Sequence, residues 1–62
     1  MILQTFTNEE LGIEAVVMDA DSINSKLGPF KVVCRDTDAD ATISVIFGSW
    51  IAVFEKAKEF VK

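Results

Sequence analysis

Hydrophobic and polar residues alternate along four short segments in the first three quarters of the chain. The segments are residues 2–7, 13–18, 30–35 and 42–47, and β-branched and aromatic residues recur in them. A period of two is typical of strands that have one face against a core. Residues 8–12 separate the first two segments and residues 36–41 the last two, and both connections hold short polar residues that favour turns. The pattern therefore predicts two antiparallel β-hairpins.

The end of the chain changes to a helical period. After Gly48, Ser49 is a favourable N-cap, and apolar residues then recur at spacings of three and four, which line one side of a helix. This apolar stripe consists of Trp50, Val53, Phe54, Ala57, Phe60 and Val61. Between the hairpins, Asp21 or Ser22 could cap one helical turn that ends at Gly28.

These elements predict one α+β domain that covers residues 1–62. It has a small antiparallel four-stranded sheet made of two β-hairpins, and one C-terminal amphipathic helix packs on one face of the sheet. The expected core face carries Ile2, Phe6, Ile13, Ala15, Val17, Phe30, Val32, Cys34, Ile43, Val45 and Phe47.

The opposite face of the predicted sheet is also partly apolar. Its apolar residues are Leu3, Val16, Met18, Val33 and Ile46. One helix cannot cover both faces, and a large exposed apolar strip usually marks an interface. We therefore expect this second face, or a sheet edge, to meet another chain, and a symmetric homodimer is the commonest such arrangement. The alternative is a monomer whose half-apolar face contacts water.

Length and composition support an assembly. A chain of 62 residues buries only about 60% of its unfolded surface, so its core is thin. Its one cysteine and lack of histidine exclude an internal disulfide and a Cys/His zinc site.

Residues 45–54, the longest nearly uncharged apolar stretch, are too few for the ~20-residue span of a membrane helix. The N-terminus lacks a basic signal region, so we expect a cytoplasmic protein.

The negative charge is concentrated in the first half of the chain. The net charge is -4, and residues 1–29 carry five acids against Lys26 alone. Such a surface repels phosphate backbones and favours basic protein surfaces or cations. Acids in loops remain available to a partner. The predicted partner-binding residues are therefore Glu9, Glu10, Asp19, Asp21, Asp36, Asp38 and Asp40. The alternative is that these acids only keep the domain soluble.

The chemistry of the side chains argues against an enzyme. Histidine and tyrosine are both lacking, and Cys34 has no candidate base and an inward pattern position. Asp36, Asp38 and Asp40 alternate as in a calcium loop, but Ala41 and Phe47 stand where that loop needs glycine and glutamate. We therefore assign no catalytic residue, metal ligand or cofactor. A looser oxygen site that includes Asp19 and Asp21 remains an alternative.

The sequence thus predicts a small acidic protein-binding or regulatory module that acts as a homodimer without catalytic activity of its own. Its partners would be a second copy and a protein with a basic surface. The first alternative is a domain that binds a divalent cation, Ca²⁺ or Mg²⁺, through the Asp-rich loops. The second is single-stranded nucleic-acid binding on the sheet face through Lys26, Lys31 and Arg35, which the acidic charge disfavours.

Overall fold

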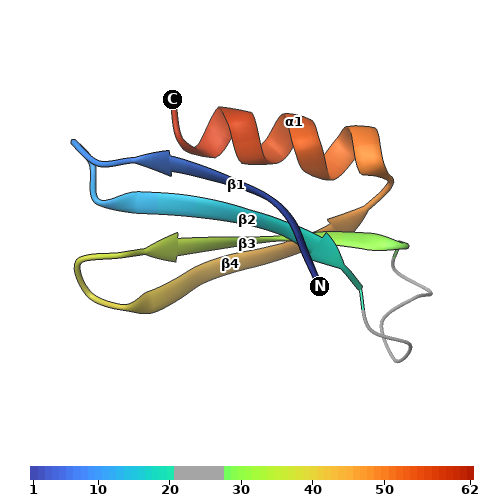
Figure 1. Cartoon of the computed structure of the whole chain (residues 1–62), viewed down its shortest axis with the longest axis horizontal. Coiled ribbons are helices and arrows are strands. Elements are labelled where there is room, and N and C mark those ends of the chain that lie inside the picture. The colour runs from blue at the N-terminus through green and yellow to red at the C-terminus, as the bar shows by residue number, and fades with distance from the viewer. Residues whose placement is uncertain (21–27) are drawn as a thin grey trace.

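The computed structural model describes residues 1–20 and 28–62. It contains a four-stranded antiparallel sheet and one helix (Figure 1). The elements are β1 (Ile2–Asn8), β2 (Ile13–Asp19), β3 (Phe30–Asp36), β4 (Ala41–Gly48) and α1 (Trp50–Phe60). Strands adjacent in the chain are adjacent in the sheet, so the order is β1-β2-β3-β4. The predicted α+β fold is confirmed, whereas the predicted helical turn from Asp21 or Ser22 lies outside the described residues.

Helix α1 starts and packs as its sequence predicts. The Ser49 hydroxyl accepts a hydrogen bond from the Ala52 backbone N–H at 3.3 Å, which satisfies one free donor of the first turn. Val53 and Ala57 are buried, and Lys58 lies in the last turn, where a cation interacts favourably with the helix dipole. The apolar stripe is therefore the surface that docks on the sheet.

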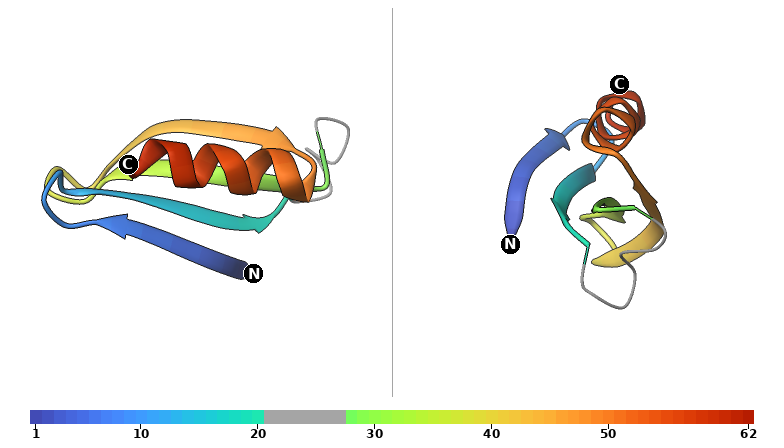
Figure 2. Two further views of the ribbon diagram at one scale, coloured as in Figure 1. Left: turned by 90° about the horizontal axis from the view of Figure 1, so that it is seen from above. Right: turned by 90° about the vertical axis from the view of Figure 1, so that its right-hand side faces the viewer.

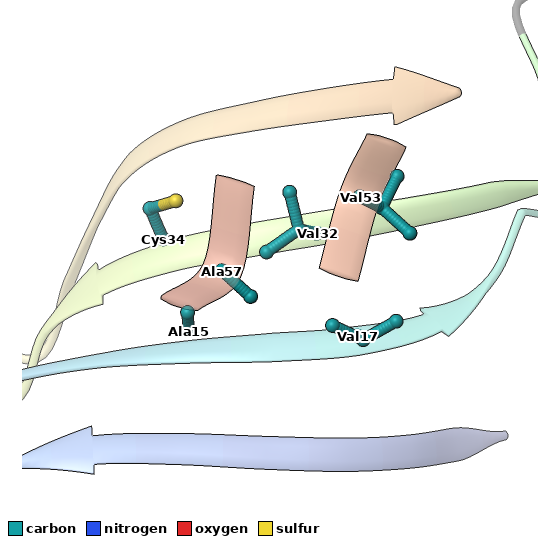
Figure 3. Packing of buried hydrophobic residues seen from close by; sticks show 6 residues of the cluster. All are labelled: Ala15, Val17, Val32, Cys34, Val53 and Ala57. Carbon is teal, nitrogen blue, oxygen red and sulfur yellow. The ribbon is translucent and has the colours of Figure 1, made fainter. Parts of the chain in front are cut away.

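The core lies between α1 and the two central strands. Seen from above, α1 lies over β3, between β2 and β4 (Figure 2). The buried cluster consists of Ala15, Val17, Val32, Cys34, Val53 and Ala57 (Figure 3). These side chains are small, so the helix approaches the sheet closely and the core is only one layer thick. Cys34 points inward as predicted and behaves as a small apolar residue.

A one-residue register shift in the second hairpin reverses the predicted faces of β4. Near the turn, Arg35 pairs with Thr42, and continuing that register would place Cys34 opposite Ile43 on the core face. Instead the register shifts after Arg35, and Cys34 pairs with Ser44. Since a shift of one residue moves side chains to the other face, the prediction that Ile43, Val45 and Phe47 share the core face is wrong.

Past the shift, each β4 residue shares the face of the β3 residue opposite. Val32 in the core pairs with Ile46, so Ile46 is on the helix side of the sheet and not on the predicted opposite face. Val45 pairs with Val33 and Phe47 with Lys31, which places both on the face that α1 does not cover. We call this the uncovered face.

Strand β1 has a second register shift, between Ile2 and Gln4. Phe6 keeps its predicted side and packs edge-on against Phe54 of α1, with ring centroids 5.2 Å apart. Ile2 pairs with Met18 and is exposed on the uncovered face, so its predicted place in the core is wrong. Leu3 falls in the shift itself.

Candidate functional site: an acidic end, an uncovered face and a bare strand edge

The two hairpin turns lie at the same end of the sheet (Figure 1). A backbone hydrogen bond joins them, because the Thr37 N–H donates to the Gly12 carbonyl at 2.8 Å. The two turns and the strand residue that enters the second turn carry Glu9, Glu10, Asp36, Asp38 and Asp40. We call these five residues the acidic end. The structure thus brings together five of the seven predicted partner-binding acids.

The turn between β3 and β4 is built by its own acids. The Asp36 carboxylate accepts hydrogen bonds from the backbone N–H groups of Asp38 at 3.0 Å and Ala39 at 3.1 Å. Asp40 has a φ of 51°, a left-handed conformation that Asp tolerates better than most residues. Asp36 therefore stabilises the turn, and the side chains of Asp38 and Asp40, which follow it, are both exposed.

The turn between β1 and β2 fits closely against the second turn. The Asn8 side chain accepts a hydrogen bond from the Leu11 N–H at 3.1 Å, and Gly12 takes a φ of 65°. A Cβ atom at Gly12 would overlap the Asp38 carboxylate. Gly12 thus leaves room for the Asp38 carboxylate of the other turn, and the hydrogen bond from Thr37 to Gly12 joins the two turns into one surface.

Arg35 neutralises part of the charge near this end. Its guanidinium pairs with Glu14 at 3.2 Å and also with Asp40. Glu9, Glu10 and Asp38 form no ion pair with any residue that the structure describes, and all three are exposed. These three carboxylates are therefore the ones available to a partner.

The other predicted acids do not join this group. Asp19 lies at the opposite end of the sheet, where it pairs with Phe30. The predicted grouping of Asp19 with the Asp-rich turn in a cation site is therefore wrong. Asp21 lies outside the described residues. Within residues 1–20 and 28–62, no three acids or cysteines are placed to hold a metal ion, and no pocket forms.

The uncovered face carries two rows of side chains that cross all four strands. One row runs Thr5, Val16, Val33, Val45, and the other runs Ile2, Met18, Lys31, Phe47. Of the predicted interface residues, Val16, Met18 and Val33 lie at the centre of this face, and Val16 is 8% exposed. Ile46 and Leu3 do not join them, for the reasons given above.

The outer edge of β4 is a feature that the sequence analysis did not single out. Ile43, Val45 and Ile46 are 55%, 42% and 37% exposed, so apolar side chains are accessible along this strand. β4 carries no charged residue and no proline. Its place as the last strand of a meander, combined with this composition, is the signal that could have identified it.

The predicted basic patch is weak. The charge of Arg35 is taken up by Glu14 and Asp40, Lys31 lies beside Met18 and Phe47, and Lys26 is outside the described residues. Most aromatic residues are used for packing: Trp50 lies 5.4 Å from both Phe30 and Phe54, measured between ring centroids. Phe47 on the uncovered face is outside these contacts, so among the residues described the sheet offers a single strand of nucleic acid one aromatic ring and no basic groove.

Comparison with protein-family models, curated proteins and solved structures finds no match to this chain. In the part of the chain that the structure describes, α1 is too short to span a bilayer, and no other segment forms a membrane-spanning helix. The function must therefore be inferred from the surfaces above.

Proposed function

We propose that this protein is a small acidic protein-binding or regulatory module that acts as a homodimer and has no catalytic activity of its own. Its partner is a protein with a basic surface, which it contacts through Glu9, Glu10 and Asp38. A reducing compartment such as the cytoplasm suits the single free thiol of Cys34.

The observation that supports this proposal is the convergence of the two hairpin turns. Loops that are far apart in sequence present carboxylates at one end, and the hydrogen bond from Thr37 to Gly12 holds them together. A fixed cluster of like charges attracts an oppositely charged surface and speeds association. A dimer would present the acidic end twice, which increases the effective affinity for a partner with two sites.

Affinity capture with two charge-matched variants tests the acidic end. The first variant carries Glu9→Gln, Glu10→Gln and Asp38→Asn. The second carries Asp19→Asn, Glu55→Gln and Glu59→Gln, three substitutions at exposed positions elsewhere. Both change the net charge from -4 to -1. We expect the wild type and the second variant to retain the same basic protein from a lysate, identified by mass spectrometry, and the first variant to lose it.

Calorimetry with the purified partner then completes the test. Affinity should fall as salt rises, because exposed charges more than about 8–10 Å apart are screened at physiological ionic strength. Adding EDTA should leave the affinity unchanged, which separates protein binding from a cation site. Equal loss of binding by both variants would show a nonspecific charge effect, and retention by the first variant would show that the acidic end is not the contact.

A further inference from the structure

Within the described residues, the outer edge of β4 lacks the charges, prolines and covering elements that protect most edge strands, and its one bulge lies near the turn, at Ile43. Natural proteins cover such edges or place charges and prolines on them, because unpaired backbone N–H and C=O groups otherwise pair with another strand. No strand in the described part of the chain pairs with this edge, and β4 has neither charge nor proline. Its register shift lies at Ile43, so residues from Ser44 onward pair regularly with β3.

The opposite edge of the sheet differs. β1 is also uncharged, but its side chains include Gln4, Thr5 and Thr7, which are exposed and polar. β1 also contacts the C-cap residue of α1, because the Asn8 side-chain amide donates a hydrogen bond to the Val61 carbonyl at 2.7 Å. A contact between β4 of one copy and β1 of the next would also be heterologous and could continue into a fibre, whereas a contact between two copies of β4 closes after two chains.

We propose that β4 pairs antiparallel with β4 of a second copy, about a two-fold axis at Val45, so that the two sheets form one continuous eight-stranded sheet. This inference rests on the homodimer in the proposed function and names its interface. The axis is perpendicular to the sheet, because only that orientation makes the two edge strands antiparallel neighbours. Both helices therefore lie on the same side of the joined sheet.

The residues that become neighbours are complementary. An axis at Val45 places Val45 opposite its own copy, Ile43 opposite Phe47 of the partner subunit, and Ser44 opposite Ile46 of the partner subunit. No charged residue of β4 enters the contact, so each strand is a suitable partner for an identical one.

The distribution of charge also favours this arrangement. Each copy has a net charge of -4, and five of its ten acidic residues belong to the acidic end at the hairpin turns. An antiparallel pair of edges places the two acidic ends at opposite ends of the dimer, more than about 30 Å apart, because even Asp40 lies five residues from the axis in each copy. That separation exceeds the Debye length of about 8 Å, so their mutual repulsion is screened.

Sedimentation equilibrium of charge variants tests the pairing. We expect the wild type to have twice the chain mass of 6.8 kDa at micromolar to millimolar concentration. Val45→Lys should be a folded monomer, because it places two ammonium groups directly opposite each other. Val45→Glu alone should likewise be a monomer. Mixing the two variants should restore a dimer, since the axis then brings opposite charges together.

Two control variants separate the edge from other surfaces. Thr5→Lys changes the other end of the same cross-strand row, and Met18→Glu changes the middle of the uncovered face. Both should remain dimeric. A Met18→Glu variant as monomeric as Val45→Lys would assign the interface to the uncovered face. A Thr5→Lys variant that dissociates would implicate β1. Failure of the mixed variants to associate would refute the axis at Val45.

Hydrogen exchange of the unmodified protein gives a test that does not depend on any variant folding. Amides of β4 should become more protected as concentration rises, while those of β1 remain unchanged. Equal exchange of β4 at low and high concentration would refute the β4 contact. A wild type that sediments at 6.8 kDa throughout would refute the homodimer itself, whereas a dimer insensitive to Val45→Lys refutes only this interface.

Discussion

The packing of α1 on the sheet predicts a large effect for Val53→Ala. Val53 is fully buried among the small side chains of β2 and β3. The substitution removes two methyl groups, worth about 0.8 kcal/mol each, and leaves a cavity, so the expected cost is about 2–3 kcal/mol. A domain of this size is stable by only about 3–9 kcal/mol. The melting temperature should therefore fall by about 10–20 °C.

Ile51→Ala is the matched control, since Ile51 lies two residues earlier in α1 and is 73% exposed. Its cost should stay below about 0.5 kcal/mol. The fluorescence of Trp50, the single tryptophan, can follow both unfolding transitions because its ring packs against Phe30. All melts need one protein concentration, because dimerisation adds to apparent stability. Equal melting temperatures for the two variants would refute the docking of α1 through Val53.

Three further substitutions test the chain near the end of β4 and the start of α1. Gly28→Ala should lower the free energy of unfolding by at least about 1–2 kcal/mol, because Gly28 has a φ of 151° and a Cβ there would lie 2.5 Å from the Gly48 nitrogen. An unchanged free energy in urea unfolding would contradict this close approach. Ser49→Ala should cost about 1 kcal/mol by circular dichroism melting, and Ser49→Asp, which keeps a capping oxygen, should recover it. If both Ser49 variants melt alike, the cap does not stabilise the helix.

The elements themselves could be predicted from the sequence. A period of two with turn residues between the segments defines the hairpins, and the change of period after Gly48 defines the helix. Both signals come from residues close together in sequence, so they do not depend on how the rest of the chain packs. Cys34 and Val32 could be placed in the core for the same reason.

The faces of β4 could not be predicted, because the register shift depends on tertiary packing and not on the local sequence. β4 has apolar residues on both faces, so either register buries some of them, and the alternating pattern alone favours Ile43, Val45 and Phe47 as core residues. The shift instead turns Ile46 toward α1. This choice leaves Val45 exposed at the edge, where the sequence analysis had expected core.

The acidic end was only partly predictable. Adjacent strands of a meander run in opposite directions, so the β1–β2 turn and the β3–β4 turn share an end, and the last residue of β2 lies at the other. That residue is Asp19, which is therefore separated from Asp38. The acids could be identified as loop residues from their positions in sequence, but which of them meet depends on the strand order.

The order of the elements along the chain also affects how the protein folds during synthesis. Helix α1, which covers Val17 and Val32, is made after all four strands. Asn8 of the first strand finds its hydrogen-bond partner at Val61, after the helix. Until the ribosome has released the helix, the nascent sheet exposes its core side to the cellular environment. Chaperones or neighbouring nascent chains would therefore meet this sheet before its own helix does.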